Sequence, residues 1–91
     1  MSKADWDDLI GQMRAVVLAV EPTLTPQQTQ PAWELIDVGE PGIAFELMCT
    51  QIHEYDATVS QQVKNSLQEL CERLGLDSKY WKMLRVAERP P

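Results

Sequence analysis

The side chains best suited to chemistry in this 91-residue chain lie in one short segment. Glu46 and Glu54 are eight positions apart, and His53 stands beside the second of them, so the three could share a helix face and exchange protons. No nucleophile elbow, phosphate-binding loop or metal-ligand spacing accompanies them. We therefore interpret the three as polar residues on a solvated helix strip and expect neither enzyme activity nor a cofactor. A pH switch at His53 is the less favoured alternative.

The two cysteines also argue against a metal centre. Cys49 and Cys71 are 22 positions apart, without CxxC spacing, and the chain has one histidine. A closed zinc site needs four ligands. Both cysteines fall on apolar helical stripes, so we expect them to be small buried hydrophobic residues.

Apolar periodicity and capping signals predict five helices, over residues 3–19, 26–38, 41–55, 60–74 and 78–86. Ser2 and Asp5 resemble a capping box before the first helix. Pro22 is expected to end that helix, because Glu21 precedes it and a residue before proline avoids the α region.

Residues 26–38 contain one unresolved point. Thr25 caps a segment with Pro26 at its first position, where the missing N–H has no cost. Pro31 leaves two alternatives: a helix kinked at this residue, or a short turn over 26–30 followed by a helix that starts at Pro31.

The stretch 37–42 predicts the corner of a helical hairpin. Gly39 follows the last periodic residue as a left-handed cap, and Pro41 is placed to start the next helix. So short a connection makes the helices over 26–38 and 41–55 close neighbours. The second of these is apolar over most of its circumference, which predicts a place at the centre of the bundle.

The C-terminal third follows the same rules. Ser60 caps the helix over 60–74, Gly75 and Leu76 fit a Schellman ending, and Asp77 caps the last short helix. Residues 87–91 are expected to fray. No segment has strand alternation, so the predicted fold class is all-α, a single domain over residues 1–91 built as a bundle of four to five helices.

The charges are unevenly distributed along the chain. Its net charge is −6, yet residues 15–63 contain seven acids and no Lys or Arg. Because acids and bases are usually interspersed on a surface, this imbalance favours a partner with a positive surface. Solubility alone is the alternative explanation. Nucleic-acid binding is disfavoured because phosphate contacts need a basic patch.

No run of about 18 apolar residues exists, and the N-terminus begins polar and acidic, so we expect a cytoplasmic protein without a membrane segment. Among the aromatic residues, helical spacing favours core positions for Trp6 and Trp81. Trp33 precedes the acidic corner and is expected to be partly exposed.

Two blocks of the sequence, LIDVGEPGIAFELM and LGLDSKYW, with EYDATVS between them, resemble the MafI-type immunity proteins of polymorphic-toxin and contact-dependent growth inhibition systems. The resemblance covers roughly residues 33–84. The matching residues are Gly39, Glu40, Gly42, Ala44, Glu46 and Leu47 in the first block, and Leu74, Gly75, Leu76, Tyr80 and Trp81 in the second.

The resemblance implies a bacterial cytosolic antitoxin that binds and blocks the C-terminal toxin domain of its cognate effector. Such toxins are often nucleases, including EndoU-like RNases, whose clefts are basic, and this agrees with the acidic stretch. The residues expected to face the toxin are Trp33, Glu34, Asp37, Glu40, Glu46, His53, Glu54, Tyr55 and Asp56.

Several points stay open at this stage. Binding away from the toxin's active site is an alternative within the same class. The oligomeric state is open, with a monomer in a one-to-one complex as the expectation. A non-inhibitory helical adaptor that self-associates, for instance through the first helix, or binds another protein is the alternative from a different class.

Overall fold

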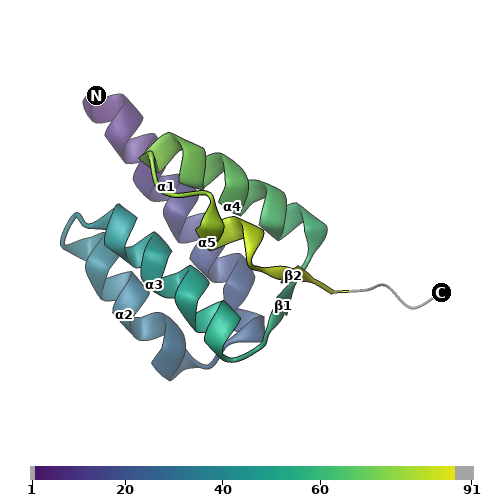
Figure 1. Cartoon of the computed structure of the whole chain (residues 1–91). Coiled ribbons are helices and arrows are strands. Elements are labelled where there is room, and N and C mark those ends of the chain that lie inside the picture. Colours follow the sequence, from purple (N-terminus) through teal and green to yellow (C-terminus); the bar gives the residue numbers. More distant parts are fainter. Residues whose placement is uncertain (1, 88–91) are drawn as a thin grey trace.

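A computed structural model describes residues 2–87 and shows a helical bundle with a small two-stranded sheet (Figure 1). Helix α1 spans Lys3–Val20 and begins with the expected capping box, in which Ser2 and Asp5 bond each other's backbone N–H groups. Its core face buries five side chains, Leu9, Met13, Val16, Val17 and Val20. The chain then tightens into a 3₁₀ turn, η1, over Glu21–Thr23, with Pro22 inside it.

Helix α2 spans Pro26–Asp37 as one element, with Pro31 inside it. The alternative of a helix starting at Pro31 is therefore wrong. The N-terminus is fixed by a second capping box, between Thr25 and Gln28. Pro31 removes one backbone N–H, so only one helical hydrogen bond is lost, and burial of Thr29, Ala32 and Ile36 holds the helix on both sides of it.

The corner between α2 and α3 has the predicted geometry. Gly39 has φ +81°, its N–H donates to Ile36 O at 3.1 Å, and the Glu40 N–H donates to Leu35 O at 2.8 Å. This is the Schellman pattern, which needs a left-handed residue that glycine supplies without strain. Helix α3 begins at once, over Pro41–Glu54.

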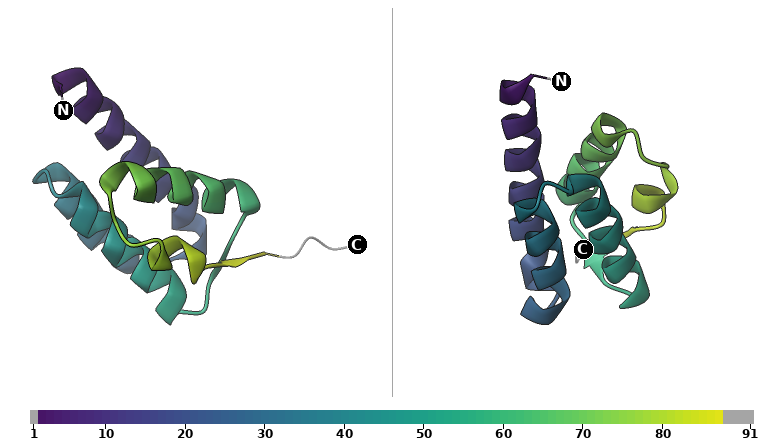
Figure 2. Two further views of the ribbon diagram at one scale, coloured as in Figure 1. Left: turned by 45° about the horizontal axis from the view of Figure 1, so that its top comes forward. Right: turned by 90° about the vertical axis from the view of Figure 1, so that its left-hand side faces the viewer.

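Helix α3 packs against α2, α1 and α5, in agreement with its wide apolar surface. Its buried residues are Pro41, Ala44, Phe45, Met48, Cys49 and Ile52. Figure 2 shows α2 and α3 as an antiparallel pair beside α1, and α4 crosses α1. The predicted adjacency of the hairpin helices is confirmed.

The C-terminal third differs from the predicted run of helix. Helix α4 spans Gln61–Leu74 and ends in a second Schellman motif at Gly75, φ +69°, as expected. Helix α5 is short, Lys79–Lys82, and Asp77 Oδ1 accepts from the Lys79 N–H at 2.9 Å. The predicted helix over 78–86 is wrong after Lys82.

Instead of continuing as helix, the chain forms strand β2, Arg85–Val86, which pairs in parallel with β1, Thr58–Val59. The Lys64 ammonium donates to Leu84 O at 2.7 Å and the Ala87 N–H donates to Val59 O at 2.8 Å, so the segment is held from two sides. Ala87 is therefore not frayed; the rest of the predicted tail, 88–91, lies outside the described residues.

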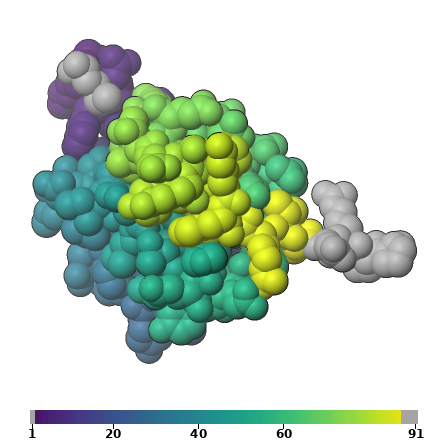
Figure 3. Space-filling view, in the orientation of Figure 1, coloured from purple at the N-terminus to yellow at the C-terminus, as the bar shows by residue number. Residues whose placement is uncertain are grey.

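Most predicted core residues are buried, including both cysteines, whose side chains are free thiols. Trp81 packs against the core while remaining partly accessible. The prediction for Trp6 is wrong, since it is 38% exposed. Trp6 belongs to the N-terminal part of α1, and this end of the helix projects past the neighbouring helices (Figure 3). No helix within residues 2–87 is both long and apolar enough to cross a membrane.

Candidate protein-binding surface

Five of the seven acids of the cation-free stretch are exposed, and they lie at two separate places. Glu34, Asp37 and Glu40 are exposed at the end of α2 and at the corner. The second group, His53, Glu54, Tyr55 and Asp56, is exposed at the opposite end of α3. At 1.5 Å per residue, α3 separates the two by about 20 Å. The nine predicted residues therefore do not form one patch.

The far end of α3 carries less uncompensated charge than the sequence indicates. Asp56, which closes α3 at φ +55°, forms an ion pair with Arg85, and the Arg85 guanidinium also donates to Asp56 O at 3.2 Å. The cation comes from β2, outside the cation-free stretch. Glu54 is thus the one unpaired acid among the exposed residues 53–56.

Glu46 has a role inside the fold. Its carboxylate accepts a hydrogen bond from the Tyr80 hydroxyl at 2.6 Å, which ties α3 to α5. This bond favours the neutral phenol and is the main reason that the pKa of Tyr80 is raised, with desolvation a smaller cause. Glu46 is half-buried and is a structural residue rather than part of an open surface.

Trp33 is half-buried, as expected of a partly exposed residue. Its indole N–H donates to Glu21 Oε1 at 2.7 Å, so α2 is linked to η1. The only hydrogen-bond donor of this side chain is therefore already used within the molecule.

The corner combines acids with exposed apolar side chains. Val38 is 73% exposed and Ile43 is 51% exposed, on either side of Gly39. Trp6 reaches the same place from α1, because its Cζ2 lies 3.9 Å from where a Gly39 Cβ would be. We call the set of Trp6, Glu34, Asp37, Val38, Glu40 and Ile43 the corner surface.

The corner surface keeps most of its negative charge. Asp37 meets Arg14 at 3.3 Å in a solvent-exposed ion pair, which has a small effect on stability. Glu34 and Glu40 have no Lys or Arg partner within residues 2–87. An exposed tryptophan and two aliphatic side chains beside unpaired carboxylates are typical of a protein-binding hot spot with a charged rim.

Sequence reasoning identified the three acids of this surface and missed its three apolar members. Val38 and Ile43 follow the helical pattern of core residues, and Trp6 has the same phase on α1 as Met13. The signal that could have found them is position: all three lie next to the glycine corner, where a helix end leaves one side uncovered.

The chemistry elsewhere in the molecule is limited. Burial raises the pKa of Cys49 and of Cys71, and the Cys71 thiol donates to Asp77 O at 3.3 Å. Thiols held neutral in this way are poor nucleophiles and poor metal ligands. Residues 2–87 hold no group of three His, Cys, Asp or Glu side chains arranged to hold a metal ion.

Comparison of the chain with protein-family models, with curated proteins and with solved structures finds no match. The two blocks that resemble the MafI-type immunity proteins come into contact in the fold, through the Glu46–Tyr80 hydrogen bond. Gly39 and Gly75, one from each block, form the left-handed helix ends. In this chain these residues serve the fold, and Glu40 alone among them is an exposed acid of the corner surface.

Proposed function

We propose that this protein is an immunity protein that binds and neutralises the toxin domain of a cognate effector. The partner is a basic protein domain, a nuclease such as an EndoU-like RNase, and the acidic surface occludes its positive cleft. The function is binding and inhibition without catalysis. The observation that carries the proposal is the corner surface, where Trp6, Val38 and Ile43 are exposed beside the unpaired Glu34 and Glu40.

The charges support a basic partner. Carboxylates without a cation partner repel one another and attract a positive surface, which speeds encounter and disfavours acidic competitors. A nuclease cleft is positive because it holds phosphates. An acidic protein therefore competes with the nucleic acid for the same positively charged side chains. The resemblance to immunity proteins points to the same class of partner.

The apolar side chains support a stable complex rather than a loose electrostatic encounter. Binding energy at protein interfaces is concentrated in a few desolvated anchor residues, among which Trp, Tyr and Arg are enriched. Trp6 is placed on the projecting end of α1, so its ring can enter a pocket on the partner without unfolding any helix.

The proposal is tested by co-expressing this protein with the product of the open reading frame immediately upstream of its gene, which we expect to carry the toxin domain, and measuring cell survival. The wild-type protein is expected to restore growth. Trp6→Ala with Ile43→Ala should lose protection at equal protein level, because both anchors are removed while the core is untouched. Protection by that double variant equal to that of the wild type would refute the corner surface as the binding site.

The mode of inhibition needs a separate comparison. If the protein occludes the active site, it competes with a short RNA for binding to the toxin. If it blocks a later step, such as docking of the toxin to an activating host factor, RNA binding stays intact while toxicity is lost. The proposal predicts competition.

A further inference from the structure

Helix α1 has a second, smaller apolar face in addition to its core face. Its inner face lies in the core, and four exposed residues on its outer face, at positions i, i+4, i+7 and i+8, are also small or apolar: Gly11, Ala15, Leu18 and Ala19. Leu18 is 58% exposed, and no charged residue belongs to this set. An exposed apolar patch on a helix surface marks a candidate interaction site.

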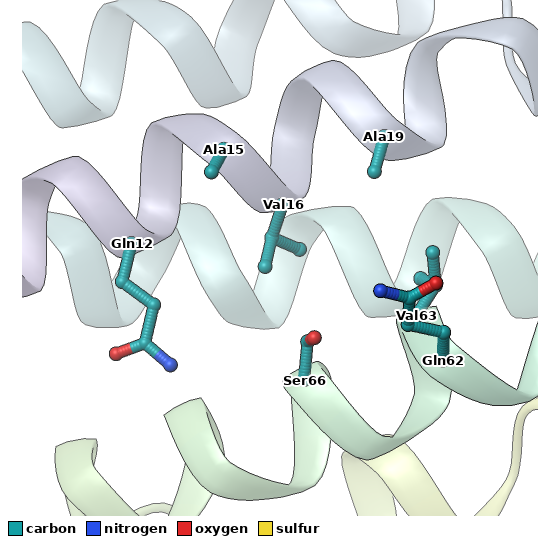
Figure 4. A pocket seen from close by; sticks show the side chains of 7 residues that line it. All are labelled: Gln12, Ala15, Val16, Ala19, Gln62, Val63 and Ser66. Atoms are coloured by element: carbon teal, nitrogen blue, oxygen red, sulfur yellow. The ribbon is translucent and has the colours of Figure 1, made fainter.

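A groove lies next to this face, between α1 and α4 (Figure 4). Its volume is about 280 Å³, and it is lined by Gln12, Ala15, Val16, Ala19, Gln62, Val63 and Ser66. Val16 of α1 and Ser66 of α4 face each other across it, with Gln12 at one end and Gln62 and Val63 at the other. None of the seven lining residues carries a charge.

Most charges next to the groove are paired within the molecule, whereas Glu69, one turn beyond Ser66 on α4, has no ion pair within residues 2–87. Arg73 meets Asp8 at 2.8 Å and donates to Gln12 Oε1 at 2.8 Å, where α4 ends against the first turns of α1. On the other side of the outer face, Arg14 is engaged with Asp37. The lining of the groove itself is uncharged and gives a basic partner little to attract it, unlike the corner surface.

We propose that this groove and the outer face of α1 bind a second copy of this chain. The face holds both a protruding side chain, Leu18, and a hollow, the groove beside it. A two-fold symmetric contact needs a self-complementary surface, and here Leu18 of each copy can fill the groove of the other. Gly11, Ala15 and Ala19 let the two α1 helices approach closely. A neutral face is also where two chains of charge −6 meet with the least repulsion.

This inference is independent of the proposed function. It rests on an uncharged face instead of an acidic one, and on different residues. Each copy in the dimer keeps its own corner surface available. The proposed dimer differs from the expected monomer in a one-to-one complex, and we propose that it binds one partner per copy.

Sedimentation of the whole chain over a range of concentrations tests the proposal. A reversible dimer is expected, and it should strengthen as salt rises, because salt screens the repulsion between the copies. Leu18→Glu should weaken dimerisation by at least about a hundredfold, because each dimer would bury two unpaired carboxylates.

Ile43→Glu is the matched control, since it changes net charge and exposed apolar area in the same way but lies on the corner surface. It should dimerise like the wild type, and circular dichroism checks that both variants are folded. A wild-type chain that stays monomeric at about 1 mM would overturn the proposal. Equal weakening by both variants would also overturn it, as would loss of toxin binding caused by Leu18→Glu, which would assign the groove to the toxin.

A second measurement locates the contact on the surface of the chain. Ala15→Cys places one accessible thiol on the outer face of α1, while the buried Cys49 and Cys71 stay unreactive. A short bismaleimide should join two copies through this thiol and should leave a Gln27→Cys variant, exposed on α2, as monomers. No cross-link at position 15, or equal cross-linking at both positions, contradicts the proposed contact.

Discussion

Replacing Gly39 by alanine should destabilise the fold by about 1 kcal/mol. The residue has φ +81°, and a residue with a Cβ costs roughly 1–2 kcal/mol in the left-handed region, of which a part is offset because alanine also restricts the unfolded chain. Packing adds nothing to this cost, because the nearest atom to the new Cβ is Trp6 Cζ2 at 3.9 Å, an ordinary contact.

Thermal or urea unfolding followed by circular dichroism measures this effect. For a chain of this length, 1 kcal/mol corresponds to a fall in Tm of about 4–8 °C. Gly75→Ala, at φ +69° with open space around the Cβ, should show the same loss.

Gly42→Ala is the control for the Gly39 prediction. Gly42 lies in α3 with no atom within 4 Å of the new Cβ and no positive φ, so alanine there should stabilise by about 0.5–1 kcal/mol. Gly39→Asn should lose less than Gly39→Ala, because asparagine tolerates the left-handed region. The reasoning fails if Gly39→Ala unfolds at or above the wild-type Tm, or if Gly42→Ala is destabilised to the same extent.

Three further predictions follow from buried contacts. Phe45→Ala should cost about 3–5 kcal/mol in urea unfolding, since the ring is fully buried in α3 between neighbouring helices; a loss below 1 kcal/mol would show that the site is not packed. The pKa of Tyr80 is raised, so the folded state prefers the neutral phenol. The contribution of this group to the free energy of unfolding is therefore fully present below about pH 10 and is lost as the pH rises further. Tyr80→Phe should therefore show a shallower fall in unfolding free energy above pH 10 than the wild type, and parallel curves would argue against the Glu46 bond. Cys49 and Cys71, both buried with raised pKa, should react with a disulfide reagent only in denaturant, and rapid labelling of the native protein would contradict their burial.

The helix ends were predictable because each depends on a local signal. Ser2 with Asp5, Thr25 with Pro26, and Ser60 act on their own backbone within three or four residues, and Gly39 and Gly75 supply a conformation that few other residues adopt. Such signals do not depend on what the rest of the chain does.

The segment after Lys82 was not predictable in the same way. A strand of two residues is too short to show an alternation of apolar and polar residues. This strand also forms only by pairing with Thr58–Val59, which lie 27 residues earlier in the sequence. The pairing is fixed by tertiary contacts, including those of Lys64 and Arg85, rather than by local propensity.

The acids of the corner surface were predictable from charge, and its apolar members were not. Helical phase shows which side of a helix an apolar residue occupies, but not whether a neighbouring helix extends far enough to cover it. Trp6 is exposed because α1 projects past its neighbours, and Asp56 loses its free charge because Arg85 arrives from a distant strand. Both facts follow from how the elements are arranged in three dimensions.

The most direct test of the central claim is the affinity for the toxin domain, measured by calorimetry at low and high salt with two double charge reversals. Glu34→Lys with Glu40→Lys reverses the corner surface, and Glu69→Lys with Glu72→Lys makes the same change of net charge on exposed residues of α4. The account predicts that the first pair weakens binding at least about tenfold at low salt, or about 1.4 kcal/mol, with a smaller loss at high salt. The second pair should have little effect. Equal losses from the two pairs, or no loss from the first, would contradict the claim that the corner surface binds the toxin.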